Sequence, residues 1–540
     1  MSDLDGGGLD TVTLTIDGVE VTVPKGTRVI EAAERTGVVV PRYCYHPGIP
    51  TRPAQCRMCL VEIEGQPKLQ PSCVLEAQDG MSILTASETA EKARQSVIEF
   101  LLVNHPLDCP ICDAAGQCML QDYAYVTTQL KSRVDEPKTV MGRDRIADDI
   151  LYFADRCIIC TRCVRFMRDV AEDDSLVVAQ RGHKAYIDTF PGRDLDNPFQ
   201  GNIVDVCPVG ALVHEDFVFK ARAWDMDATA GICPGCSTGC NVTIDTKENQ
   251  IVRLKPRHNA EVNSYWMCDH GRKHLVMSNR GIRAEVPMIR DGDSLRATDW
   301  PTAIAWIAAR IRQAGSNGGL GIASPNSSNE NLFYFSRLLS RLGIDRWEYS
   351  VPQGSTASLP TVPRLELRAD RAANGKGGEL FGGTRVDAEA VPSPARAGET
   401  IVVLEDGLAE APDGFGSEAG FFLYVGSRLP DAAREADAVL PIATFAEMDG
   451  TFTNFEGRVQ RFHRALQAPG IARPAWMVLA RVLAALDDLE PVSDVGAALD
   501  AMASATAAFA GMSWQGLGLK GALVGGDAAA VGAAPAEIDG

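Results

Sequence analysis

The chain has 540 residues, enough for roughly three or four domains, and its 45% hydrophobic and 23% charged residues are typical of a globular protein. No apolar run reaches the roughly 18 residues that a membrane-spanning helix requires, which excludes an integral membrane chain. The net charge of −19 opposes binding to a phosphate backbone, so we expect no nucleic acid partner.

The cysteines point to metal or redox chemistry. The N-terminal stretch MSDLDGGGLD lacks the basic and apolar regions of an export signal, so we expect a cytoplasmic protein, in which disulfides are rare. The chain contains 15 cysteines, all between Cys44 and Cys268. An odd number of cysteines in a cytoplasmic chain favours metal ligands over disulfides.

The first cysteine group follows a predicted ferredoxin-like fold. Residues 11–37 predict a β-hairpin with Asp17 and Gly18 at its turn, then a helix that ends near Gly37. The group that follows is Cys44, Cys56, Cys59 and Cys73. Two strands, a helix and a cysteine-bearing loop are typical of plant-type [2Fe–2S] ferredoxins, although the first gap has 11 residues where those proteins usually have about four. A structural zinc site is the alternative that the preceding fold pattern disfavours.

The second group combines three cysteines with a histidine, after a predicted helix at residues 86–105. Its spacing is H-x3-C-x2-C-x5-C and its members are His105, Cys109, Cys112 and Cys118. Three thiolates need a fourth ligand to complete a [4Fe–4S] cluster or a tetrahedral zinc site. A single histidine is usually an ordinary surface or core residue, but this one lies on the same loop, so we predict that it is a ligand.

The third group has the C-x2-C-x2-C spacing of bacterial [4Fe–4S] ferredoxins. Its members are Cys157, Cys160 and Cys163, completed by the remote Cys207, which precedes a proline. Zinc sites usually present paired Cys-x-x-Cys knuckles, so zinc is a poor alternative. In two-cluster ferredoxins the fourth cysteine belongs to the other cluster, and spacing alone leaves open whether Cys118 and Cys207 exchange partners.

The fourth group has the spacing C-x2-C-x3-C-x27-C, formed by Cys233, Cys236, Cys240 and Cys268. This pattern resembles the start of molybdopterin oxidoreductases, where a small β-rich lobe holds a [4Fe–4S] cluster. A zinc ribbon is the alternative. Four sites of four ligands need sixteen donors, and the 15 cysteines plus His105 supply that number with none left over.

The C-terminal half predicts an α/β domain with a parallel sheet. Apolar runs at 319–325, 400–406 and 420–427 predict buried strands, and the 3.6-residue rhythm at 329–343 and 474–488 predicts helices. One segment resembles the Glu…Gly-Thr…Asn…Glu-Gly-Arg stretch of molybdopterin oxidoreductases; its members are Glu447, Gly450, Thr451, Asn454, Glu456, Gly457 and Arg458.

Several features predict that this domain is degenerate and binds no molybdopterin. No cysteine follows Cys268, and His270 stands where catalytic members often have a lysine. The Gly-rich stretch 315–321 lacks the G-x-G-x-x-G fingerprint, so we expect no NADH site. Residues 368–398 predict a long Gly/Ala-rich loop, and the Ala/Gly-rich tail from about residue 521 predicts disorder.

With these four groups in this order, the chain resembles the G subunit of bacterial NADH–quinone oxidoreductase, the counterpart of the 75 kDa subunit of mitochondrial complex I. The resemblance implies four self-contained sites, namely a [2Fe–2S] cluster on Cys44, Cys56, Cys59 and Cys73 and three [4Fe–4S] clusters on His105, Cys109, Cys112 and Cys118, on Cys157, Cys160, Cys163 and Cys207, and on Cys233, Cys236, Cys240 and Cys268. The fourth cluster would lie off the main electron path.

The resemblance also implies a function and partners. A flavoprotein subunit would oxidise NADH, and this chain would relay single electrons to downstream iron–sulfur subunits and onward to quinone. The chain would be an enzyme only as a subunit of this translocase. It would be peripheral on the inner face of the cell membrane, associated with the membrane only through the complex.

The expected fold class is α+β iron–sulfur domains, first plant-type and then bacterial ferredoxin-like, followed by a shortened α/β molybdopterin-oxidoreductase-like domain. The expected domains are 1–88 with the [2Fe–2S] site, 89–225 with two [4Fe–4S] sites, the β-rich lobe 226–282, the degenerate domain 283–520 and the tail 521–540. The alternatives are the large subunit of an NAD-linked formate dehydrogenase, the relay subunit of an NAD-coupled hydrogenase, and a zinc-stabilised scaffold.

Overall fold

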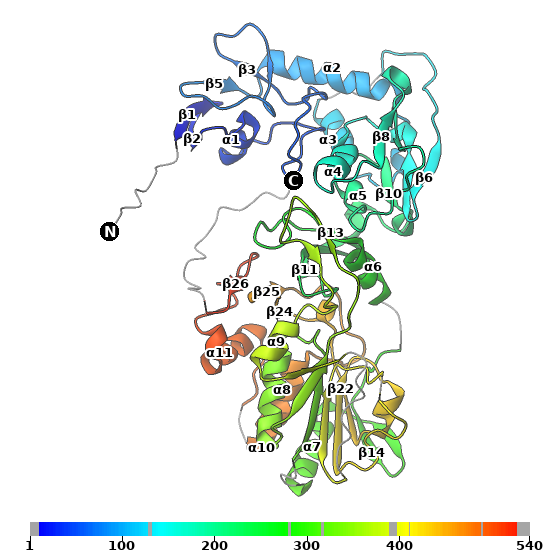
Figure 1. The fold of residues 1–540 in the computed structure, drawn as a ribbon, viewed down its shortest axis with the longest axis vertical. Coiled ribbons are helices and arrows are strands. Elements are labelled where there is room, and N and C mark those ends of the chain that lie inside the picture. The colour runs from blue at the N-terminus through cyan, green and yellow to red at the C-terminus, as the bar shows by residue number, and fades with distance from the viewer. Residues whose placement is uncertain are drawn as a thin grey trace, which may run out of the picture. The chain divides into compact units, whose positions relative to one another are not determined.

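The computed structural model describes residues 10–127, 132–278, 282–314, 318–387, 397–409, 411–487 and 490–525 (Figure 1). The chain divides into two compact units. The first runs to Met226 and includes Leu359–Thr361, and the second begins at Asp227 and contains the remainder. Among the described helices, none combines the length and the hydrophobicity that crossing a bilayer would require.

The first unit opens with a five-stranded sheet in the order β2-β1-β5-β3-β4. Its elements are β1 (Thr11–Ile16), β2 (Val19–Pro24), α1 (Val29–Arg35), β3 (Leu60–Ile63), β4 (Gln70–Pro71) and β5 (Ser82–Leu84). Asp17 and Gly18 both have positive φ, 46° and 83°, as a two-residue type I′ hairpin turn requires. Leu14 and Ile16 alternate with threonines and pack against the buried face of α1. The predicted hairpin and helix are confirmed.

The rest of the first unit consists of short elements that carry the next two cysteine groups. These elements are α2 (Glu88–Asn104), α3 (Met119–Val126), β6 (Arg143–Ala147), β7 (Ile150–Phe153), α4 (Arg162–Asp169), β8 (Leu176–Ala179), β9 (Tyr186–Thr189), α5 (Asn202–Asp205) and β10 (Leu212–His214). The Ser87 side chain caps α2 by accepting a hydrogen bond from the Ala90 amide at 3.2 Å, and His105 is the C-cap residue. The predicted helix therefore ends at the predicted histidine ligand.

The second unit begins with the small lobe that carries the fourth group. Strands β11 (Asp227–Ile232), β12 (Asn241–Lys247) and β13 (Gln250–Pro256) form an antiparallel sheet, which α6 (Asp269–Ser278) follows. The β-rich character that the sequence predicts for this lobe is confirmed.

An eight-stranded sheet forms the centre of the second unit, in the order β15-β14-β23-β22-β21-β16-β17-β20. Its strands are β14 (Met288–Asp291), β15 (Ser294–Ala297), β16 (Gly319–Ala323), β17 (Trp347–Ser350), β20 (Thr384–Val386), β21 (Thr400–Leu404), β22 (Phe421–Gly426) and β23 (Ala438–Pro441). The six strands from β23 to β20 are parallel to one another. Strand β14 pairs antiparallel with β23 on one side and with β15 on the other. The predicted α/β domain with a parallel sheet is confirmed.

Helices cover one face of this sheet. Figure 1 shows α7 (Trp300–Ala314), α8 (Asn329–Arg341) and α10 (Ala475–Asp487) gathered beside β22. In β21 and β22, Val402 and Leu423 join the cluster under these helices, whereas the alternate residues Val403 and Phe422 join a second apolar cluster. Because both faces are buried, the strands read as continuous apolar runs.

The remaining elements of the second unit are β18 (Ala357–Ser358), β19 (Glu366–Leu367), α9 (Gly375–Leu380), β24 (Gly450–Thr453), β25 (Arg458–Phe462), α11 (Val495–Ala505) and β26 (Ala522–Leu523). Two predictions are wrong in part. The predicted loop 368–398 contains α9 and β20, and its residues 388–396 lie outside the described residues. The predicted disordered tail begins too early, because β26 pairs antiparallel with β25 and Ala522 is buried; residues 526–540 lie outside the described part.

Candidate metal centres

The first group brings four sulfurs together: Cys44, Cys56 and Cys59 lie in the loop between α1 and β3, and Cys73 follows β4. Cys44, Cys59 and Cys73 are buried and Cys56 is half-buried. The Cys44 amide lies 3.5 Å from the Cys56 sulfur. Hydrogen bonds from the thiols of Cys56 and Cys73 lower the pKa of Cys44, and a thiol hydrogen bond from Cys73 lowers that of Cys59. These interactions bring the four sulfurs next to one another, and a metal would bind them in the thiolate form.

The second group lies between α2 and α3. Cys112 and Cys118 are buried, Cys109 is exposed, and each of these three sulfurs lies in the electrostatic field of another. Burial raises the pKa of Cys118 to about 11. Burial, followed by the charges of Lys138 and Arg156, lowers the pKa of His105 to about 4. A neutral imidazole is the form that binds a metal.

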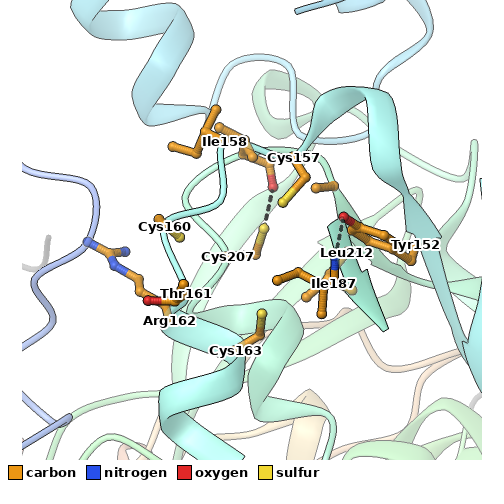
Figure 2. Close-up of a pocket in the computed structure, with 12 residues that line it drawn as sticks. Tyr152, Cys157, Ile158, Cys160, Thr161, Arg162, Cys163, Ile187, Cys207 and Leu212 are labelled. Atoms are coloured by element: carbon orange, nitrogen blue, oxygen red, sulfur yellow. Dashed lines mark hydrogen bonds between the residues drawn. The ribbon is translucent and has the colours of Figure 1, made fainter. Parts of the chain in front are cut away.

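Figure 2 shows the third group, whose four cysteines line one cavity. About 330 Å³ of empty space, open solvent included, lies among the lining residues, and most of the lining side chains other than the cysteines are apolar. The lining residues are Tyr152, Cys157, Ile158, Cys160, Thr161, Arg162, Cys163, Ile187, Cys207, Val209, Ala211 and Leu212. Burial raises the pKa of Cys157 to about 11 and that of Cys160 to about 12. Four convergent sulfurs in an apolar wall are the donor set that a [4Fe–4S] cluster takes, so these residues fit that group.

The fourth group is fully buried in the small lobe. Cys233 follows β11, Cys240 precedes β12 and Cys268 precedes α6. The Cys233 amide donates to the Cys240 carbonyl at 2.8 Å, which closes the loop that holds Cys236. Gly271 lies so close that a β-carbon there would stand 2.6 Å from the Cys233 sulfur. Burial raises the pKa of Cys268 to about 12.

Left-handed residues shape the first and third loops. Arg57, between Cys56 and Cys59, has φ +59°, and Ile159 and Thr161, which flank Cys160, have φ +50° and +61°. A non-glycine residue in this region costs on the order of 1–3 kcal/mol, which the surrounding fold must offset. Such conformations turn consecutive cysteines toward one point, and the spacing of the cysteines gives no sign of them.

Two arginines, the buried Arg94 and the half-buried Arg222, also support the loops, and sequence reasoning missed them. Arg94 of α2 donates to the Met58 carbonyl at 3.2 Å and to the Leu60 carbonyl at 3.0 Å, on either side of Cys59. Arg222 donates to the Cys112 carbonyl at 2.5 Å. Arginines near cysteines in a polar segment give no sequence signal of burial, because their acceptors lie far away in the chain.

The molybdopterin-like stretch makes contacts within the second unit. Glu447 pairs with Arg283 at 2.6 Å, and Arg458 lies 3.3 Å from Glu261. The Thr451 hydroxyl donates to the buried Glu330 carboxylate at 2.7 Å. In the part of the chain that the structure describes, no group of three or more His, Cys, Asp or Glu side chains is arranged to hold a single metal ion.

Sequence models of protein families match five segments of the chain. They are a 2Fe-2S iron-sulfur cluster binding domain at 10–88, the NADH-ubiquinone oxidoreductase-G iron-sulfur binding region at 94–132, the ferredoxin-like domain of NADH-quinone oxidoreductase subunit 3 at 148–213, the molybdopterin oxidoreductase Fe4S4 domain at 226–279 and molybdopterin oxidoreductase at 418–485. These matches confirm the predicted fold class.

The chain is also similar to named relatives. It is 30% identical to the mitochondrial NADH-ubiquinone oxidoreductase 78 kDa subunit of Candida albicans, over 90% of this chain and 84% of that protein. The chain belongs to the family of this NADH-ubiquinone oxidoreductase subunit. The G subunit of NADH-quinone oxidoreductase from Streptomyces coelicolor is 35% identical over 81% of the chain, and that from Mycobacterium bovis is 39% identical over 59%. The chain covers 51% and 40% of these two bacterial proteins, about half of their length or less.

One solved structure is similar over part of the chain. A chain of an NAD+-reducing [NiFe]-hydrogenase has 31% identity and a TM-score of 0.34, covering 39% of this chain and 90% of that one. The family assignment rests on the sequence relatives and on the family models, which include iron–sulfur binding regions named for this oxidoreductase.

Proposed function

We propose that the chain relays single electrons within an NADH–quinone oxidoreductase, from an NADH-oxidising flavoprotein subunit toward quinone. Its clusters would be one [2Fe–2S] on the first group and three [4Fe–4S] on the second, third and fourth groups. The ligands would be Cys44, Cys56, Cys59 and Cys73; His105, Cys109, Cys112 and Cys118; Cys157, Cys160, Cys163 and Cys207; and Cys233, Cys236, Cys240 and Cys268. Such clusters supply one-electron transfer when bound.

The observation that carries the proposal is the lining of the cavity at the third cysteine group. Four cysteines that are separated by up to 50 positions in the chain converge on one apolar space, and Cys207 lies there with Cys157, Cys160 and Cys163. This convergence supports a self-contained third site, and it argues against an exchange of Cys207 with Cys118. In the other three groups most of the cysteines are also buried; the exceptions are the half-buried Cys56 and the exposed Cys109.

The chain's own residues would hold the ligands and give the third site a largely apolar wall. Ile158, Ile187 and Leu212 form apolar walls around the third group, and Tyr152 accepts a hydrogen bond from the Ile187 amide at 3.1 Å (Figure 2). In the second group, Lys138 donates to the Leu102 and Val103 carbonyls at 2.8 and 3.0 Å and so fixes the end of α2 before His105. A neutral imidazole in place of a thiolate removes one negative charge from that site.

The partners in this proposal are the flavoprotein subunit and the downstream iron–sulfur subunits. The chain would be peripheral on the inner face of the cell membrane and would associate with the membrane through the complex. The second unit would serve as a structural domain without molybdopterin. We propose domain limits of 1–88, 89–225, 226–282 and 283–520, with the last element, β26, extending the final domain to about residue 525.

NADH-driven reduction tests the relay directly. The full chain, reconstituted with iron and sulfide without oxygen, is mixed with NADH alone and then with NADH plus a catalytic amount of the flavoprotein subunit. We expect no bleaching of the visible absorbance with NADH alone and complete bleaching once the flavoprotein is present. Reduction by NADH alone would place an NADH site on this chain, and no reduction in either mixture would contradict the relay.

A further inference from the structure

Helix α4 carries two buried arginines between the first and the third group. Arg162 and Arg165 are one turn apart and bracket Cys163, and both are buried. Figure 2 shows Arg162 at the rim of the cavity of the third group. Its guanidinium extends away from that cavity toward the N-terminal segment. A helix that belongs to one group therefore presents its charges to another.

Arg162 binds the backbone beside ligands of both groups. Its guanidinium donates to the Tyr45 carbonyl at 2.5 Å, one residue after Cys44, and to the Val206 carbonyl at 3.2 Å, one residue before Cys207. These two acceptors are separated by 161 positions in the sequence. The guanidinium is thus a direct physical link between the loop of the first group and that of the third.

Arg165 reinforces the same link from the next turn. Its guanidinium donates to the Cys44 carbonyl and to the Thr51 carbonyl, the latter at 2.7 Å, and its Nε donates to the Thr161 hydroxyl at 3.3 Å. Every acceptor is a neutral oxygen in the loop of the first group or in that of the third. Arg165 also lies in the electrostatic field of Asp169, so its charge is partly compensated.

The charge of Arg162 has no such compensation from a carboxylate. Within the described residues Arg162 forms no ion pair with Asp or Glu, and its buried Nε has no hydrogen-bond partner. Removing a guanidinium from water without a counter-ion is strongly unfavourable. The charged or ionisable groups in whose field it lies are Cys160, Arg42, Cys207 and Cys44. The three cysteines belong to the first and third groups and would carry negative charge as thiolates once a cluster is bound.

We propose that Arg162 is a positioning residue that acts as the shared counter-charge of the first and the third cluster and raises the reduction potential of both. A cluster on four thiolates is anionic and becomes more so on reduction, so a buried cation between two such sites stabilises each reduced state. The inference rests on the proposed function, because it assumes clusters on both groups. Arg165 contributes mainly to the first cluster, whose Cys44 carbonyl it binds.

Redox titration of three variants of the full chain tests this inference. Arg162→Met keeps much of the length and volume but removes the charge, and Arg162→Lys keeps the charge but loses the fork of donors. Arg168→Met is the matched control, because Arg168 lies on the same helix with 51% of its side chain exposed. The binuclear EPR signal reports the first group, and the tetranuclear signal that is absent from Cys160→Ser identifies the third.

We expect Arg162→Met to change the ratio of reduced to oxidised cluster at a fixed potential by at least about tenfold toward the oxidised form in both groups. For a one-electron couple this equals a potential lowered by about 59 mV. Arg162→Lys and Arg168→Met should stay within about threefold of the parent chain. Unchanged potentials in an Arg162→Met chain with its full iron content would overturn the proposal. Equal shifts of potential in Arg162→Met and Arg162→Lys would also overturn it, because they would assign the effect to lost hydrogen bonds and not to lost charge.

Loss of clusters is informative as well. If Arg162→Met loses the first and the third signal while Arg162→Lys retains them, the positive charge is needed for assembly and the proposal stands. If both variants lose both signals, the shape of the guanidinium is what matters and the proposal fails. Failure of the proposed function looks different, because then the parent chain itself would lack the binuclear and tetranuclear signals.

Discussion

Gly210 lies directly beside Cys112: a β-carbon at position 210 would stand 2.2 Å from the Cys112 sulfur. The backbone that follows Cys207 of the third group thus packs against a ligand of the second. The Met119 amide donates to the Pro208 carbonyl at 3.0 Å and ties the same two segments together. The two sites are therefore in direct contact at Gly210, where the Cys112 sulfur leaves no space for a side chain.

The substitution Gly210→Ala should therefore displace the Cys112 sulfur. We expect the reconstituted chain to lose one tetranuclear EPR signal and about four iron atoms, the content of one [4Fe–4S] cluster. The control is Gly407→Ala, because nothing lies within 4 Å of a β-carbon built at that exposed glycine. A Gly210→Ala chain with a full set of signals would show that the sulfur has room to move.

Substitution of His105 should alter one tetranuclear cluster only. In His105→Ala we expect one [4Fe–4S] signal to shift or disappear while the binuclear signal stays intact. In His105→Cys a thiolate replaces a neutral imidazole, and the added negative charge should lower the potential of that cluster. His183→Ala, an exposed histidine, is the control. If all reduced-state signals of His105→Ala match the parent chain, His105 is not a ligand.

The fourth ligands of the second and third groups can be assigned by comparing two serine variants. Cys207→Ser should weaken the same signal as Cys160→Ser, because both sulfurs line one cavity. Cys118→Ser should weaken a different signal, the one that changes in His105→Ala. The reverse pairing would mean that the two cysteines exchange partners, as in two-cluster ferredoxins.

Glu405 should make the stability of the second unit depend on pH. This residue follows β21 and binds the Ser327 hydroxyl at 2.5 Å and the Asn331 amide group at 3.3 Å. Burial raises its pKa from an ordinary 4.5 to about 7. Between these values the folded chain holds a proton that the unfolded chain releases, so stability falls as the pH rises through this range and stays lower above pH 7.

The substitution Glu405→Gln keeps this position neutral at every pH. We expect it to raise the Tm at pH 8 by about 2–4 °C, the shift that about 1 kcal/mol produces in a domain of this size, and to change the Tm little at pH 5. Thermal melts at both pH values measure the difference, and the exposed Glu418→Gln serves as the control. Equal effects at pH 5 and pH 8 would contradict a proton on Glu405.

The sequence was sufficient for the elements whose signals are local. The turn at Asp17 and Gly18 and the helix that ends at His105 follow from residue types in adjacent positions, and the structure has both in the predicted places. The cysteine spacing is a local signal of the same kind, and it predicts four groups of candidate ligands. In the third group, three of the four cysteines lie on one short loop, and the structure gathers the whole group around one cavity.

The features that the sequence did not indicate depend on distant segments. The helix RCVRFMRD has four charged residues in eight, a composition that suggests an exposed surface. Arg162 is nevertheless buried, because it packs against the segment that contains its acceptor Tyr45. That segment lies 117 positions away in the sequence and could not be predicted as a neighbour. The Ala/Gly-rich end suggests disorder, but β26 gains its order from pairing with β25. Tertiary contacts override local composition in both cases.

The most direct test of the central claim is the metal and sulfide content of the full chain after anaerobic reconstitution. We expect about 14 iron atoms and about 14 sulfide ions per chain, as one [2Fe–2S] and three [4Fe–4S] clusters contain, without molybdenum or tungsten. A colourless chain that carries zinc in place of iron would contradict it.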